Sequence, residues 1–180
     1  SHSSDRSDSS SVVYQHEPFT IFCSRILDLA ASNWPDSDVN GFCAERLSGG
    51  GFFASSASHD RTSAGETRYI VRIPRFDSAK VDGEVAVLHF VGRIAIPVPT
   101  VITFDKTAGN ALGLLYMIQN WIVGTDLSSC FPGLNHGQKA SIARELSAIF
   151  RQMLEIRSST GGRLVLDSEK GAVRIAPLSQ

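Results

Sequence analysis

A glycine-rich run stands early in the sequence at Gly49-Gly50-Gly51-Phe52-Phe53-Ala54. Backbone without side chains can approach phosphate oxygens closely and donate its N–H groups to them. The run fits the relaxed dinucleotide fingerprint G-x-G-x-x-A, but that fingerprint needs a helix directly after it and an acid after the next strand. Neither is indicated here, and no P-loop lysine follows. The run therefore predicts a turn between antiparallel strands, either a phosphate-covering loop or a plain hairpin turn.

Arg72 and Glu84 form a second candidate for chemistry. Arg72 is the one charge within the apolar run 69–74, and Glu84 lies at the edge of the apolar stripe of a predicted helix. A desolvated carboxylate without a partner is costly, and a guanidinium can hold a carboxylate and a phosphate through separate edges. Arg72 is the natural candidate for the partner of Glu84, and two alternatives carry equal weight at this point. The alternatives are that both side chains reach water separately, or that Glu84 pairs with Lys80 or Arg93.

The elements that position these residues are predicted from hydrophobic periodicity. Helices are expected at 21–34, 78–91 and 135–157, the last opened by a capping box of Asn135 and Gln138. Strands are expected at 42–47, 67–73, 101–104, 114–122, 163–167 and 172–175. The first two strands would form a hairpin, with the polar stretch 59–66 as a turn, and the last two would form another. This order predicts an α+β fold with an antiparallel sheet.

The composition excludes several classes of protein. The 180 residues, 42% of them apolar, suffice for one domain or for one and part of another. The net charge of −1 gives no field for nucleic acid or an anionic membrane, and no apolar run approaches a membrane span. Cys23, Cys43 and Cys130 are odd in number and far from any Cys/His cluster, so we expect reduced thiols, a cytoplasmic protein and no metal site.

Taken in order, these segments resemble the small lobe of a protein-kinase-like fold. More closely, they resemble the phosphotransferase enzyme family that includes aminoglycoside and choline kinases, especially its fungal branch. The resemblance spans residues 21–178, and the order and spacing of the motifs carry it. The matching stretches are LSGGGF at 47–52, YIVRIP at 69–74, EVAVL at 84–88, IPVP at 96–99, residues 116–124, LEIR at 154–157, and a linking hairpin at 162–164 and 171–178.

The resemblance implies a site for ATP. The loop that covers the phosphates would consist of Gly49, Gly50, Gly51 and Phe52. Arg72 would stand where most kinases place a lysine that contacts the phosphates, and Glu84 would be its partner on the helix. Arginine in place of lysine departs from kinases generally, although we expect it in the fungal branch.

The resemblance also implies how the adenine is bound. Gln119 would occupy the gatekeeper position behind the base. The carbonyl of Asn120 and the N–H of Ile122 would meet the adenine edge, with the side chain of Trp121 pointing elsewhere.

The resemblance divides the chain into a disordered serine-rich tail (1–17), a nucleotide-binding small lobe (18–125), and a linker helix and hairpin that begin the second lobe (126–180). The family's chemistry needs an H-x-D loop with a downstream Asn and a later metal-binding Asp. No histidine of this sequence is followed two places on by aspartate, and the sequence ends at Gln180, where these parts should begin. We therefore expect no catalytic residue and no phosphotransfer activity, with ATP as ligand and Mg²⁺ only when the second lobe is present.

Two other functions stay open. The first is a non-catalytic, kinase-like interaction or regulatory module. Met153 and Leu154 would face the second lobe, and their exposure predicts self-association, by exchange of the long helix or of the final hairpin. The second is nucleic-acid binding through Arg163, Lys170 and Arg174, which we disfavour because three charges without interleaved aromatics are ordinary surface.

Overall fold

The computed structural model describes residues 19–35, 42–46, 53–62, 65–74, 79–94, 96–167 and 172–177. The predicted tail at 1–17 lies outside these residues. The helices are α2 (Phe19–Asn33), α3 (Ala79–Arg93), α4 (Leu127–Cys130), the 3-10 helix η2 (Phe131–Gly133) and α5 (His136–Glu155). The strands are β1 (Ala44–Arg46), β2 (Phe53–Thr62), β3 (Gly65–Pro74), β4 (Val101–Asp105), β5 (Tyr116–Asn120), β6 (Arg163–Asp167) and β7 (Ala172–Ala176).

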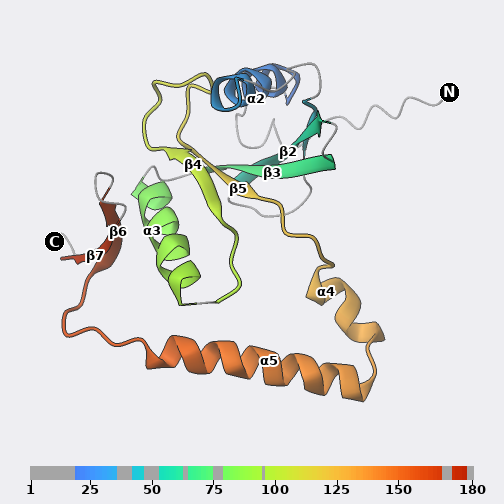
Figure 1. Ribbon diagram of the computed structural model, residues 1–180, viewed down its shortest axis with the longest axis vertical. Helices are drawn as coiled ribbons and strands as arrows, with labels where there is room; N and C mark the ends of the chain where they lie inside the picture. The colour runs from blue at the N-terminus through green and yellow to red at the C-terminus, as the bar shows by residue number, and fades with distance from the viewer. Residues whose placement is uncertain are drawn as a thin grey trace.

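The described strands form two antiparallel sheets, which confirms the predicted α+β class. The larger sheet has five strands in the order β1-β2-β3-β5-β4, and β6 and β7 form a separate hairpin. β5 therefore lies between β3 and β4, although β3 and β5 are separated in the chain by α3 and β4 (Figure 1). This order brings Arg72 on β3 opposite Met117 on β5.

The large sheet has a different helix on each face. Neighbouring residues of a strand point to opposite faces, so Val71 and Ile73 of β3 join one core cluster with Ile26 and Leu29 of α2. Met117 of β5 lies on the other face, in a cluster with buried side chains of α3. The face turned to α3 is also the face that carries Arg72, because Arg72 and Met117 are paired across the two strands.

The stretch 59–66 was expected to be a turn, and this prediction is wrong. β2 continues to Thr62, and its register with β3 runs from Phe53 opposite Pro74 to Thr62 opposite Gly65. β2 lies between β1 and β3, but β1 pairs only with Ser56, Ala57 and Ser58. Residues 59–62 pair with 65–68 of β3, and this ladder stabilises an extended backbone whatever the polarity of the sequence. The expected two-stranded hairpin is therefore a three-stranded antiparallel arrangement.

The long helix α5 begins as the sequence predicts. The backbone N–H of Gln138 donates to Asn135 Oδ1 at 3.0 Å, and the backbone N–H of Asn135 donates to Gln138 Oε1 at 2.9 Å. The helix ends at Glu155, two residues before the expected Arg157, and it has no buried residue. The short helices α4 and η2 were not predicted, since four and three residues are too few to show a hydrophobic period.

The final hairpin was predicted correctly, and it packs against α3. Helix α3 therefore lies between the large sheet and the hairpin, while α5 runs along the far end of the molecule (Figure 1). Within the described ranges, no helix combines the length and the apolar character needed to cross a bilayer.

Candidate functional site

An ion pair joins the sheet to helix α3. Arg72 Nη2 lies 2.8 Å from Glu84 Oε1, and the two side chains are 23% and 29% exposed. The expected pairing of these residues is confirmed. Because both groups are partly withdrawn from water, the geometry favours a pair stronger than an ordinary surface salt bridge, and removal of either partner leaves a desolvated charge.

The position of this ion pair follows from the packing of α3. Val81 and Val85 are buried against Met117 of β5. Glu84 precedes Val85 by one residue, so it lies on the flank of this buried stripe. Arg72 lies directly across from Met117. The apolar contact and the ion pair therefore fix the same turn of α3 against the same point of the sheet.

Gln119 shares the face of the sheet that carries Arg72. It lies two residues after Met117 on β5 and opposite Ile70 on β3. The residue is 8% exposed, and its Oε1 atom is buried without a hydrogen-bond partner. A buried amide oxygen without a hydrogen bond costs folding free energy. This oxygen is therefore available to accept a hydrogen bond from a ligand or from an ordered water molecule.

The chain that follows β5 is held by its neighbours on both sides. The N–H of Asn120 donates to Thr100 O at 3.1 Å, and the N–H of Trp121 donates to Arg68 O at 3.0 Å. The side chain of Asn120 also accepts a hydrogen bond of 2.6 Å from the backbone N–H of Thr100. The guanidinium of Arg68 lies 5.8 Å from the centre of the Trp121 ring, in a cation–π contact.

Ile122 is the next residue along this segment. Its side chain is 57% exposed. No described residue accepts a hydrogen bond from its backbone N–H. The segment after β5 is thus held in place at Asn120 and Trp121, and the backbone N–H of Ile122 has no acceptor among the described residues.

The glycine loop cannot be placed beside these residues. Gly49, Gly50, Gly51 and Phe52 lie outside the described residues. The strands on either side of the loop, β1 and β2, are described and pair antiparallel. The sequence predicted an antiparallel pair across the loop, but with 67–73 as the second strand in place of β2.

Two further features were missed by sequence reasoning. The backbone of Thr100 holds both the backbone N–H and the side-chain oxygen of Asn120. The proline-rich segment 96–99 gave no signal for this contact. A cavity of about 340 Å³ lies between the end of α3 and the start of β4. Its lining includes Leu88, His89, Arg93, Val98 and Thr100.

The cysteines and the acidic residues are dispersed. Cys23, Cys43 and Cys130 carry free thiols. Among the residues that the structure describes, no three or more His, Cys, Asp or Glu side chains gather in a group that could hold a metal ion.

One comparison with known proteins identifies the chain. No curated protein and no solved structure matches the sequence. Residues 50–164 match the sequence profile described as "Phosphotransferase enzyme family". The matched range covers more than half of the chain and includes Arg72, Glu84 and the segment after β5. The chain therefore belongs to the Phosphotransferase enzyme family.

Proposed function

We propose that this chain is the nucleotide-binding lobe of an ATP-dependent kinase that phosphorylates a small molecule. The observation that carries the proposal is the ion pair of Arg72 and Glu84 at 2.8 Å, in a chain of the phosphotransferase family. A guanidinium has five N–H donors, so one group can serve a carboxylate and phosphate oxygens together. Arg72 would hold the phosphates, and Glu84 would orient Arg72.

The adenine would bind at the end of β5. The backbone N–H of Ile122 supports this role, because no described residue accepts a hydrogen bond from it. The carbonyl of Asn120 would accept a hydrogen bond from the base, and the fixed position of Asn120 against Thr100 supports a preorganised edge. Gln119 would lie behind the base, where its buried and unpaired Oε1 atom needs a donor.

The loop of Gly49, Gly50, Gly51 and Phe52 would cover the phosphates. Phosphoryl transfer also needs a residue that orients the acceptor hydroxyl and carboxylate or amide ligands for Mg²⁺. The sequence holds no H-x-D motif for these roles. We therefore propose that the chain binds ATP without turnover, and that Mg²⁺ and the acceptor are bound together with a second lobe. The fungal branch and a cytoplasmic location, which the free thiols support, belong to the same proposal.

A second candidate function is a non-catalytic interaction module that self-associates. The observation in its favour is the unburied helix α5. Phe150 and Leu154 are 61% and 68% exposed on this helix, and Leu146 and Met153 are also exposed. Apolar side chains in such number on one helix usually mark a surface that another surface covers.

Calorimetric titration of the full chain with ATP and with adenosine tests the primary proposal. We expect ATP to bind, and we expect Arg72→Met to weaken ATP by about tenfold or more, the usual effect of losing a hydrogen bond to a charged group. Adenosine, which has no phosphate, should bind both proteins equally. Arg144→Met, which changes an exposed arginine of α5, is the matched control. Absence of ATP binding by the unmodified chain, or equal ATP affinity in Arg72→Met, would contradict the proposal.

A further inference from the structure

Helix α3 is covered by an element that comes much later in the chain. β4 and β5 of the large sheet contact α3 on one side, and β6 and β7 contact it as well (Figure 1). Ala86 is fully buried, as is Val85 before it. Consecutive residues of a helix point about 100° apart, so the covered part of α3 extends beyond the stripe that faces the sheet.

One side chain of the hairpin reaches the cluster that positions Glu84. Leu166 of β6 packs against the buried group of Val81, Val85 and Met117. Val81 and Val85 flank Glu84 on α3, so Leu166 contacts the same turn of the helix that carries the carboxylate. Asp82 in this turn forms a longer ion pair with the turn after β4, with Lys106 Nζ 3.8 Å from Asp82 Oδ2 and both side chains exposed.

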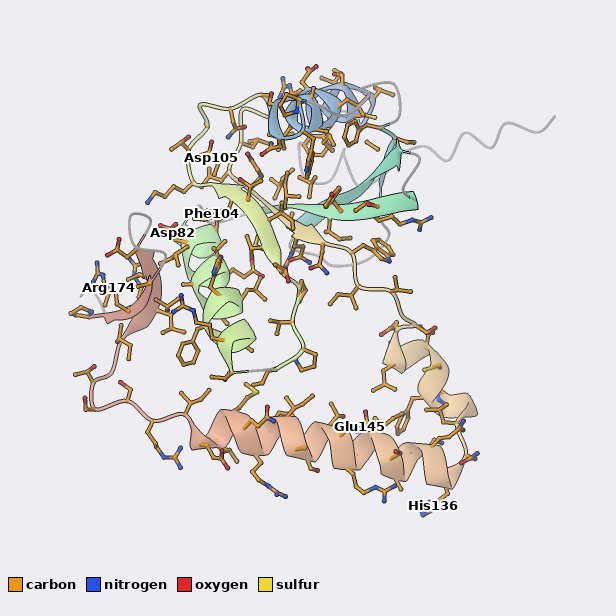
Figure 2. The ribbon with its side chains drawn as sticks, viewed as in Figure 1. Asp82, Phe104, Asp105, His136, Glu145 and Arg174 are labelled. Carbon is orange, nitrogen blue, oxygen red and sulfur yellow. The ribbon has the colours of Figure 1, made fainter. Side chains whose placement is uncertain are left out.

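The two faces of the hairpin differ in what they contact. Leu166 is paired with Val173, and Val165 with Arg174, so Val165 and Arg174 lie on the face opposite Leu166. Arg174 is exposed, and Figure 2 shows it on the side of the hairpin away from α3. The hairpin thus turns the face of Leu166 to α3, and Arg174 on the opposite face is exposed.

We propose that the β6–β7 hairpin is the positioning element of the Arg72–Glu84 ion pair, with Leu166 as the side chain that holds α3 in place. Burial of apolar side chains along the helix stabilises its position more strongly than one partly exposed ion pair does. The consequence for ATP rests on the proposed function: Glu84 orients Arg72 only while the hairpin keeps α3 against the sheet.

NMR of the arginine guanidinium groups in the full chain tests the proposal without a nucleotide. Proton exchange at the Arg72 guanidinium, assigned with Arg72→Met, should be slow because the ion pair protects it. Leu166→Ala should speed this exchange roughly tenfold, since the helix loses a packed side chain. Leu166→Val, a smaller truncation for the case that Leu166→Ala does not fold, should show a smaller increase. Val165→Ala, which shortens a half-buried side chain on the face opposite Leu166, is the matched control and should leave the exchange unchanged.

Equal exchange rates in the unmodified chain and in the folded Leu166 variants would overturn the proposal. So would an equal increase in Val165→Ala, because it would indicate a general loss of stability. A selective increase in the Leu166 variants supports it.

Nucleotide titration of the same variants provides a second readout. Leu166→Ala should weaken the binding of ATP more than the binding of adenosine. This difference should disappear in a Glu84→Gln background, where the hairpin has no carboxylate to position. Equal weakening of both ligands, or an undiminished effect in Glu84→Gln, would overturn the positioning role. If the unmodified chain binds no ATP, the proposed function fails, and the exchange measurement still decides the role of the hairpin.

Discussion

Individual polar residues fix the loops on which the site depends. Asp105 at the end of β4 accepts hydrogen bonds of 2.7 Å from both the backbone N–H and the hydroxyl of Thr107, and one of 3.1 Å from the Asn110 amide. Asn110 in turn accepts from the backbone N–H of Leu112, which is fully buried in the core. Figure 2 shows Asp105 next to Phe104 at the end of β4. A single carboxylate thus orders the turn that leads into β5.

This carboxylate predicts an acid dependence of stability. Burial alone would raise the pKa of Asp105, but the hydrogen bonds from Thr107 and Asn110 outweigh it and hold the pKa below its usual value of 3.8. The ionised group therefore stabilises the fold above the unfolded-state pKa, and this stability is lost as the pH falls through the lower, folded-state pKa. Asp105→Asn should be less stable than the unmodified chain at neutral pH, with a smaller further loss in acid. Urea unfolding between neutral pH and about pH 3 measures this.

Thr107→Ser keeps the hydroxyl donor and serves as the control. Its free energy of unfolding should depend on pH in the same way as that of the unmodified chain. The same acid dependence in Asp105→Asn and in the unmodified chain would show that Asp105 does not stabilise the turn.

The residues of the candidate site differ in how far the sequence alone predicts them. The pairing of Arg72 and Glu84 could be predicted because each is a charge beside an apolar run, and burial requires a partner for it. The unpaired Oε1 atom of Gln119 could not, since its surroundings arise from the register of β5 with β3. The roles of Asn120 and Ile122 came only from the family resemblance, and they stay predictions.

Among the elements, α5 is the one whose boundaries depend most directly on local sequence. Its N-terminus is fixed by the capping box of Asn135 and Gln138, and no tertiary burial supports it. β2 is the opposite case, because its extended backbone depends on pairing with β1 and β3. Sequence reasoning located α5 within two residues and missed β2, which is the outcome expected when local signals determine one element and tertiary pairing the other.

The capping box predicts a local effect of mutation. Asn135→Ala should weaken the first turn of α5 by about 1 kcal/mol, because the backbone N–H of Gln138 loses its acceptor, Asn135 Oδ1. Amide hydrogen exchange at Lys139 and Ala140 should become faster, while the amides of β3 and β5 should be unchanged. Ser147→Ala, in the middle of the helix, should not speed exchange, since alanine is the better helix former. Unchanged exchange in Asn135→Ala would contradict the role of the cap.

At the scale of the whole molecule, α5 and the hairpin behave differently. The hairpin returns to pack on α3, whereas α5 keeps apolar side chains exposed along its length. The sequence predicted both elements but not the packing of the hairpin on α3, since the 69 residues 94–162 separate the end of α3 from the start of β6. Contacts over such separations leave no periodic signal in either segment.

The exposed face of α5 predicts self-association. The unmodified chain should form dimers or larger species at high concentration, and Phe150→Glu combined with Leu154→Glu should shift it to monomers by removing the apolar contact and adding like charges. Light scattering coupled to size-exclusion chromatography measures the mass. Arg151→Glu, an exposed charge change on the same helix, should leave the association unchanged. A clean monomer of the unmodified chain at high concentration would count against an interface on α5.

Because the hairpin returns to α3, residues 121–162 form a long connection between two packed elements: β5 of the large sheet precedes it, and the hairpin on α3 follows it. The entropic cost of closing such a connection grows only slowly with its length. Insertions or exchanges of sequence within this connection would leave the large sheet, α3 and the hairpin in place. Residues 121–162 are therefore the segment whose length and binding partner evolution could change most readily while the Arg72–Glu84 ion pair is retained.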